Sequence, residues 1–371
     1  MADASRTDGG NVAAVPEIDA VMTAGPRRAG SEAERRAARY LERSLRELGR
    51  EAQVEPTRVR PSFGLTHLIH AVAGIVASVL SVYQPPAGLA LAAVATASAF
   101  GDLTGAFYLV RMLTPVRASQ NVRSADERAK PGLIVIVAHY DAPVTGMLLD
   151  RRLRRWPLAL LGSLALIAVC ALGRLAGLDA TWFTLLQFIP TVVLIAMTPL
   201  FADAAISDTG AGLADNAAGV SAALRLAESQ SGRLSHFDLM VLFSGASAHS
   251  GLGMRAWLKR HGNELDPAAT AVIAIDNVGD GVPAYAVKEG PVFAARMHPT
   301  LVELAGGDAG EPFTSIEISD AYVARAAGLP ALRISTAGGS AAADPDAITR
   351  VHDYVGDLLE QIDQEIGPLL T

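Results

Sequence analysis

The chain has 371 residues, which is enough for two ordinary domains or for one large α/β domain with additions. Half of its residues are hydrophobic, and its formal net charge of -7 is spread over both halves without a dense basic face, which argues against nucleic acid as a partner. The mean hydropathy of +0.29 is too high for a purely soluble enzyme of this length, so part of the chain is expected to lie in lipid. The single cysteine, Cys170, excludes an internal disulfide and a Cys-X-X-Cys zinc site.

The first predicted element is a soluble amphipathic helix within residues 16–54. Ser31 is its expected N-cap. Apolar residues recur after it at helical spacing, at Ala37, Tyr40, Leu41, Leu45 and Leu48. The residues before this helix are polar and lack the basic and apolar regions of a signal peptide, so no cleaved export signal is expected.

Four apolar segments follow, in two pairs, and each is about long enough to cross a bilayer. The first pair covers 65–83 and 87–110, separated by Gln-Pro-Pro, and the second covers 156–173 and 181–202. Buried core helices of a soluble protein are the alternative, but four such runs of about 18 or more residues rarely arise that way. We therefore expect two transmembrane helical hairpins.

The placement of arginine predicts the orientation of these hairpins. Arginines gather at the segment ends that face the rest of the protein, whereas the far side carries only Arg174. The positive-inside rule then predicts a multi-pass protein of the cell membrane, with the soluble domain and both termini in the cytoplasm. The basic run 151–155 could also bind anionic lipid, and Tyr83, Trp156 and Trp182 are expected to anchor the segment ends at the interface.

With the hairpins set aside, the rest of the chain alternates between strands and helices. Strands are expected at 132–141, 236–245, 270–279 and 330–336, and helices at 216–229, 251–262, 319–328 and 347–366. This alternation predicts an α/β fold with a mainly parallel or mixed sheet sandwiched by helices, and functional residues beyond the carboxyl ends of the strands. The expected division is 1–64 for the N-terminal helix and the start of the domain, 65–110 for the first hairpin, 111–155 for the domain, 156–202 for the second hairpin and 203–371 for the rest of the domain.

Histidine and aspartate residues lie at the ends of several predicted elements. His139 and Asp141 follow one strand, Asp276 follows another, and Asp215 precedes a helix. One imidazole and two carboxylates suit zinc, or less well manganese, and Asp141 is placed to accept the second N–H of His139. Each aspartate alone is more often a helix cap or a solvated loop residue, so the prediction of a metal site depends on their combination.

Several segments resemble, in order, the co-catalytic di-zinc aminopeptidases of metallopeptidase family M28, which share their fold with glutaminyl cyclases. The matching segments include VAHYDAP (137–143), LADNAAGVSAALRLAE (213–228), LFSGASAHSGLGMRAWL (242–258) and SDAYVARAAGLPAL (319–332). The resemblance covers essentially the whole soluble part and implies the zinc aminopeptidase fold. It further implies that His139, Asp215 and Asp276 hold the first metal, with Asp215 bridging to a second.

The chain also departs from this family at residues that the chemistry requires. The family has two consecutive glutamates, one as general base and one as second-metal ligand, where this chain has Ser247 and Ala248, or Ala248 and His249 in an alternative alignment. The family's last histidine ligand falls on Ser340. The resemblance therefore implies one zinc ion at most, no general base, and His249 as a candidate ligand of a second metal. The alternative for His249 is an exposed turn histidine.

Three ionisable residues lie within the first predicted hairpin. His67 and His70 are three residues apart in one segment and Asp102 lies in the other, all about 5–12 Å deep at a helical rise of 1.5 Å per residue. Because ionisable groups in a membrane are costly and often functional, they suggest a polar site for a lipid headgroup or a proton. Interfacial histidines with one hydrogen bond between helices are the alternative.

The leading interpretation is a four-helix membrane protein with a catalytically impaired zinc-aminopeptidase-like domain. Such a domain would act as a binding or scaffold module for peptides or a partner protein, in contact with membrane lipid. A working metallopeptidase that hydrolyses peptide N-termini is the second interpretation, so whether the protein is an enzyme stays open at this stage. The third is a membrane protein that handles lipids or solutes and has a regulatory domain.

Overall fold

The computed structural model describes residues 25–366 apart from 127–129, 150–152, 154, 211, 213–215, 308–309 and 339–343. Among the described residues, nine strands form one sheet: β1 (Ala52–Val59), β2 (Arg117–Ala125), β3 (Gly132–His139), β4 (Phe237–Ser244), β5 (Thr270–Ile275), β6 (Val282–Glu289), β7 (Ala295–Arg296), β8 (Glu311–Ser315) and β9 (Ala331–Ala337). Their spatial order is β1-β2-β4-β3-β5-β9-β6-β7, and β8 pairs with β6.

The centre of this sheet is parallel. Strand β3 pairs in parallel with β4 and β5, and β5 pairs in parallel with β9, whereas β1, β2 and β6 join through antiparallel pairs. Every residue of β4 and β5 is buried, which is typical of parallel strands that are covered on both faces. The predicted α/β class with a mixed sheet is confirmed, and the carboxyl ends of β3, β4, β5 and β9 meet at one edge.

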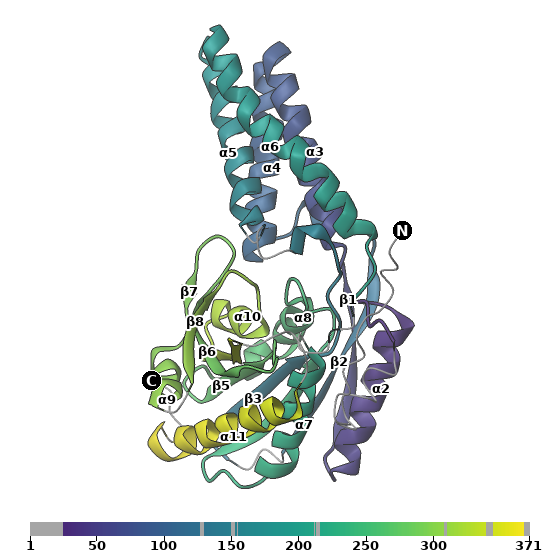
Figure 1. Ribbon diagram of the computed structural model, residues 1–371, viewed down its shortest axis with the longest axis vertical. Coiled ribbons are helices and arrows are strands. Elements are labelled where there is room, and N and C mark those ends of the chain that lie inside the picture. The colour runs from purple at the N-terminus through teal and green to yellow at the C-terminus, as the bar shows by residue number, and fades with distance from the viewer. Residues whose placement is uncertain are drawn as a thin grey trace, which may run out of the picture.

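Helices cover both faces of the sheet (Figure 1). They are α2 (Glu32–Glu47), α7 (Ala218–Gln230), α8 (Leu252–His261), α9 (Pro299–Gly307), α10 (Asp320–Ala326) and α11 (Pro345–Gln361). Right-handed crossovers take the chain from β3 through α7 to β4 and back through α8 to β5, so α7 and α8 lie on opposite faces. Helices α2 and α11 contact α7, and α10 contacts α8. The predicted N-cap of α2 is confirmed, because Ser31 Oγ accepts the N–H of Glu34 at 3.1 Å.

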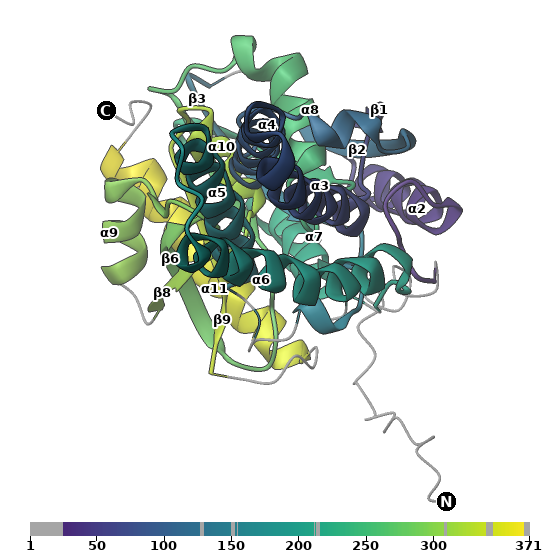
Figure 2. The same ribbon diagram turned by 90° about the horizontal axis from the view of Figure 1, so that it is seen from above.

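Four further helices form two hairpins that project from the sheet domain (Figures 1 and 2). They are α3 (Phe63–Tyr83), α4 (Pro85–Thr104), α5 (Trp156–Leu175) and α6 (Thr181–Ile206). All four are long and apolar enough to cross a membrane. The first hairpin is inserted between β1 and β2, and the second between β3 and α7. Short helical turns complete the description: η1 (Val110–Leu113), η2 (Met147–Leu149), η5 (Gly262–Glu264) and η6 (Ile362–Ile366).

Small residues let the four apolar helices pack closely. The buried alanines inside the bundle include Ala71, Ala77, Ala92, Ala95, Ala99 and Ala204. A Cβ atom added at Gly88 of α4 would lie only 2.4 Å from the Cα atom of Ser81 in α3. The outer surface of the bundle instead carries large apolar side chains such as Val169 and Phe188, each 62% exposed.

The helix predicted at 87–110 is too long, because α4 ends at Thr104. Gly105 adopts a left-handed conformation with φ 71° and ends the helix, and its N–H donates to the carbonyl oxygen of Asp102 at 3.3 Å. The chain then turns into η1, which brings the side chain of Arg111 back against α4. Arg111 is therefore buried at the base of the hairpin, 2% exposed, and does not lie on the surface beside it.

A polar network joins the distal ends of the two hairpins. Arg174 of α5 donates from Nε to Gln187 Oε1 of α6 at 2.6 Å. Gln187 Nε2 in turn donates to the carbonyl oxygen of Ser78 at 2.7 Å and to Ser81 Oγ at 2.9 Å, both in α3. Since these side chains are buried, the network fixes α3, α5 and α6 relative to one another.

Candidate functional site

A cavity of about 1720 Å³ lies between the carboxyl ends of the central strands and the base of the hairpins. Its floor includes His139 at the end of β3, Ser247 after β4 and Asp276 after β5. Its roof includes Phe63 of α3 and Trp156 of α5, which are the first residues of their helices. The cavity is therefore bounded by both the sheet domain and the apolar hairpins.

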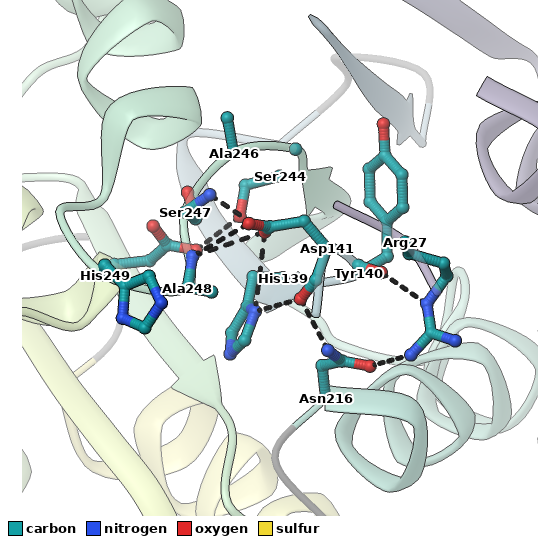
Figure 3. A network of polar contacts seen from close by, with 12 residues as sticks. Arg27, His139, Tyr140, Asp141, Asn216, Ser244, Ala246, Ser247, Ala248 and His249 are labelled. Carbon is teal, nitrogen blue, oxygen red and sulfur yellow. Dashed lines mark hydrogen bonds and ion pairs between the residues drawn. The ribbon is translucent and has the colours of Figure 1, made fainter. Parts of the chain in front are cut away.

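His139 and Asp141 lie together at the end of β3. His139 Nδ1 lies 3.1 Å from the backbone oxygen of Asp141 and 3.6 Å from its carboxylate (Figure 3). The carboxylate instead accepts the backbone N–H groups of Ser247 at 2.8 Å and Ala248 at 3.2 Å. Asp141 thus positions His139 with its main chain and holds the loop after β4 with its side chain.

That loop occupies the place where the resembled family has two glutamates. Ser247 and Ala248 supply no carboxylate there, and Ala246 adopts a left-handed conformation with φ 54°, which is unusual for a residue other than glycine. Glu34 of α2 holds the loop from below, since its carboxylate accepts the N–H of Ala246 at 3.0 Å and the hydroxyl of Ser119 at 2.7 Å. Burial raises the pKa of Glu34 to about 8, and the nearby Asp141 carboxylate adds to this rise.

His249 is half-buried, so the alternative of an exposed turn histidine is wrong. Its Nε2 accepts the backbone N–H of Val144 at 3.0 Å, and its ring stacks on Phe63 with a centroid distance of 5.0 Å. Burial lowers the pKa of His249 to about 4, because the charged imidazolium would lose its hydration. His249 therefore links the loop after β4 to the loop after β3 and to the base of α3.

Asp276 is engaged by a buried arginine that the sequence interpretation missed. Arg333 of β9 donates from Nε to the Asp276 carboxylate, and its other nitrogens donate to Glu289 at 2.7 Å and Glu317 at 2.8 Å. Burial raises the pKa of Asp276 and raises that of Glu289 to about 7, and the Arg333 charge opposes both shifts. Arg333 is the only charged residue in the predicted strand segment PALRIST (330–336). A single arginine in an apolar strand is the sequence feature that could have indicated a buried ion pair.

Asp320, at the start of α10, is a further carboxylate on the cavity wall. Its Oδ2 accepts the hydroxyl of Ser244 at the end of β4. The side chain is 5% exposed, and burial raises its pKa to about 6. With Asp276 and Glu317 it gives the floor three carboxylates beside Arg333, and Arg155 is a second arginine in the described lining of the cavity.

The predicted residues Asp215 and Ser340 lie outside the described part of the chain, as does most of the arginine run 151–155. The neighbouring Asn216 is described and buried. Its Oδ1 accepts from the guanidinium of Arg27 at 2.6 Å, and Arg27 Nε donates to the backbone oxygen of Tyr140 at 2.8 Å (Figure 3). The start of α7 is thereby tied to the end of β3.

The described residues do not fit a two-zinc centre. Asp276 is paired with Arg333, and the positions of the glutamate pair hold Ser247 and Ala248. Within the part of the chain that the structure describes, no three His, Cys, Asp or Glu side chains are arranged to hold a metal ion.

The three ionisable residues of the first hairpin are brought together at its base. Asp102 accepts two hydrogen bonds from Arg111, at 2.7 and 2.6 Å, and His67 Nε2 lies 3.8 Å from the same carboxylate. His70 Nε2 lies 2.8 Å from the hydroxyl of Ser98. Arg111 is thus a fourth member of the cluster, and it also lies 3.3 Å from the Ser250 hydroxyl in the loop after β4.

Two of the predicted interfacial anchors are exposed and one is not. Tyr83 is 79% exposed and Trp182 is 61% exposed, both at distal ends of the hairpins. Trp156 is half-buried and packs edge-on against Phe63 at 5.4 Å and against Phe201 at 5.5 Å. It therefore joins the two hairpins at their base and does not anchor the chain as an exposed ring.

The strand order and the acidic and imidazole side chains at the strand ends agree with the zinc aminopeptidase fold that the sequence motifs predicted. Residues 196–365 match the sequence model described as Peptidase family M28. This match spans less than half of the chain and confirms the resemblance of its sequence motifs to the family. No curated protein matches the sequence.

Solved structures share this fold at low sequence identity. A leucine aminopeptidase precursor from Bacteroides thetaiotaomicron gives a TM-score of 0.53 at 13% identity, over 93% of this chain and 94% of that chain. A glutaminyl cyclase from Fimbriiglobus ruber gives 0.53 at 13% identity, over 94% and 92%. An aminopeptidase from Aneurinibacillus sp. strain AM-1 gives 0.51 at 14% identity, over 93% and 92%. At such identities these matches show the fold alone.

Proposed function

We propose that this protein is a membrane-embedded relative of the zinc aminopeptidases whose domain binds a ligand in the cavity but has lost the two-zinc peptidase reaction. The observation that carries this proposal is the bond between Arg333 and Asp276. Two like unit charges about 4 Å apart repel by roughly 4 kcal/mol at an effective dielectric constant of about 20. A guanidinium at Asp276 therefore opposes a divalent cation at the same carboxylate.

The loop after β4 supports the same proposal. Activation of water for hydrolysis requires a positioned base as well as a metal, and loss of the base typically lowers the rate about 10²–10⁴-fold. Ser247 and Ala248 provide no such base, and their N–H groups are bonded to Asp141. Hydrogen bonds thus hold the loop in a conformation that offers no carboxylate to act as the general base.

Membrane insertion is supported by the dimensions and surface of the hairpins. Helix α3 has 21 residues, which gives a length of about 31 Å at 1.5 Å per residue, close to the ~30 Å hydrocarbon core of a bilayer. Large apolar side chains on the outer surface, such as Val169 and Phe188, are suited to lipid. By the arginine distribution, the sheet domain lies on the cytoplasmic side.

Zinc content and peptide hydrolysis test this proposal together. The protein, purified in detergent and dialysed against buffer with trace zinc, is expected to hold one equivalent or less and to leave aminoacyl chromogenic substrates intact. Two equivalents of bound zinc, or turnover that disappears in Asp215→Ala, would instead establish a working aminopeptidase. In that protein the Arg333 contact would have to open when metal binds.

One observation favours a role in lipid handling as a second candidate. The ends of α3, α4 and α5 that lie next to the sheet domain contribute Phe63, Leu103 and Trp156 to the roof of the cavity. A ligand in the cavity would therefore contact the hairpins as well as the domain. A regulatory domain alone would not require this shared surface.

A further inference from the structure

A second, smaller hollow lies between α4 and α5, in the part of the hairpins that is proposed to be in the membrane. Its volume is about 500 Å³, and almost all of its surface is apolar. Its walls are one face of each helix, mainly Ala93, Ala97 and Phe100 of α4 and Leu161, Ala165 and Ala168 of α5. We name this hollow the α4/α5 groove. The small side chains leave room that a lipid chain would fill, because the surrounding solvent there is lipid.

The α4/α5 groove and the cavity share the same two helix faces. Leu103, which lines the cavity, follows Phe100 of the groove by one turn of α4. Pro157, which also lines the cavity, precedes Leu161 of the groove by one turn of α5. From Ala93 to Leu103 the groove and its continuation extend about 15 Å at 1.5 Å per residue, which is half of the ~30 Å hydrocarbon core. The groove and the cavity are therefore neighbours along α4 and α5, and together they extend over about the depth of one leaflet.

The floor of the cavity suits a cationic head. Among the described residues that line the cavity, Arg333 and Arg155 are the arginines, and Arg333 bonds the lining carboxylates of Asp276 and Glu317 as well as the fully buried Glu289. Asp320 adds a third carboxylate to the floor and is 5% exposed; its Oδ1 meets no described donor in full hydrogen-bond geometry, although the Ser247 hydroxyl interacts with its carboxyl group. The side chain of Glu317 is 62% exposed, so it can bond a ligand while it keeps its contact with Arg333. An amine would place a positive charge and N–H donors beside the carboxylates of Asp320 and Glu317.

We propose that the α4/α5 groove and the cavity form one binding site for a single-chain amphiphile with an amine head. The alkyl chain lies between α4 and α5, and the amine lies on the acidic floor near Asp320 and Glu317. This proposal rests on the membrane insertion in the proposed function, but not on the loss of peptidase activity. It predicts that ligand reaches the domain from the lipid of the adjoining leaflet.

Electron paramagnetic resonance of the full chain in phosphatidylcholine nanodiscs tests the site. The probe is stearylamine with a doxyl spin label near the end of its chain, and the matched probe is stearic acid with the same label. The wild-type protein is expected to give an immobilised component with the amine probe, and to bind it roughly tenfold more tightly than the acid probe, the effect of about one charge-assisted hydrogen bond. Equal binding of the two probes would overturn the assignment of the head.

Tryptophan substitutions test the groove. Ala97→Trp on α4 and Ala165→Trp on α5 fill it from opposite walls, and each is expected to remove the immobilised component. Ala196→Trp, on the exposed surface of α6, is the matched control and is expected to retain it. Glu317→Gln is expected to lower the preference for the amine while the chain stays immobilised. If the groove variants keep the component as the control does, the probe reports only lipid at the protein surface and the proposal is wrong.

Membrane insertion and the amphiphile site can be contradicted separately. A chain that is released from membranes by an alkaline wash contradicts membrane insertion before any probe is added. A chain that stays in the membrane but does not immobilise the amine probe contradicts only the amphiphile site.

Discussion

A buried guanidinium that bonds three carboxylates, as Arg333 does, is stable only while its partners keep their charges and positions. The same is true in reverse, since Asp276 and Glu289 would be unpaired acids without it. Removal of the arginine therefore acts on fold stability and on metal affinity at the same time.

Arg333→Leu is expected to lower the free energy of unfolding by about 3–5 kcal/mol, because the charges that remain in the floor lose their partner. Added zinc is expected to restore part of this loss in the variant and to leave the wild type unchanged. Thermal denaturation in detergent, with and without zinc, measures both effects. Arg350→Leu is the control, since its partially exposed pair with Asp344 contributes about 1 kcal/mol or less. Equal stabilisation of wild type and Arg333→Leu by zinc would contradict the proposed competition.

Glu34 predicts a pH dependence of stability. Burial raises the pKa of Glu34 from its ordinary value of 4.5 to about 8, so the folded protein holds a proton that the unfolded chain releases. The stability from this group is therefore fully present below pH 4.5 and is lost as the pH rises towards 8. Glu34→Gln is expected to be less stable at low pH, because an amide cannot accept all of the hydrogen bonds, and to show a smaller loss between pH 5 and 8 than the wild type.

Urea denaturation of wild type and Glu34→Gln across this range measures the difference. Glu32→Gln, an exposed residue of the same helix, is the control and should follow the wild type. A parallel decline in all three proteins would assign the pH dependence to other groups.

At the scale of elements, long apolar runs and the alternation of strands with helices predicted the centre of the sheet and the four hairpin helices. The edge strand β1 and its neighbour β2, and the strands β6, β7 and β8, were not predicted. Strand β1 contains Pro56, which is tolerated because β1 lies at the edge of the sheet. Local pattern cannot show which short polar segment pairs with an existing sheet, since that depends on contacts distant in sequence.

The candidate site shows the same limit. Its loops were predicted because polar residues followed strands, and His139 and Asp276 do lie on one cavity. The pairing of Asp276 with Arg333 joins residues 57 positions apart and was not visible in either segment alone. The ion pair between Arg111 and Asp102 was not predicted, because Arg111 was interpreted only as a signal of membrane topology.

The close approach of α3 and α4 makes a specific prediction for glycine. Gly88→Ala is expected to destabilise the protein, because the added methyl group would lie 2.4 Å from Ser81 Cα and the helices would have to separate. Gly162→Ala on α5 is the matched control, since a Cβ atom there meets nothing within 4 Å and alanine favours helix by about 1 kcal/mol. Thermal unfolding in detergent compares them. Equal unfolding temperatures would mean that the hairpin tolerates the wider spacing.

For the whole molecule, the orientation in the membrane can be tested by labelling. In a Cys170→Ala background, Gly177→Cys places a thiol between α5 and α6 at the distal end, and Arg46→Cys places one on α2 of the domain. A membrane-impermeant maleimide is expected to label the distal thiol in intact cells and the domain thiol only after lysis. The opposite pattern would place the domain outside the cell, and labelling of both before lysis would contradict insertion of the second hairpin.

The order of the hairpins in the chain also sets an order for synthesis. Strand β3 leaves the ribosome before the second hairpin, but both of its neighbours in the sheet, β4 and β5, follow that hairpin. With the proposed membrane insertion, the nascent chain carries a largely apolar strand without partners while α5 and α6 enter the bilayer. The domain cannot close its sheet until the second hairpin has been synthesised, so a failure of this hairpin to insert is expected to leave the domain unfolded and exposed to proteolysis.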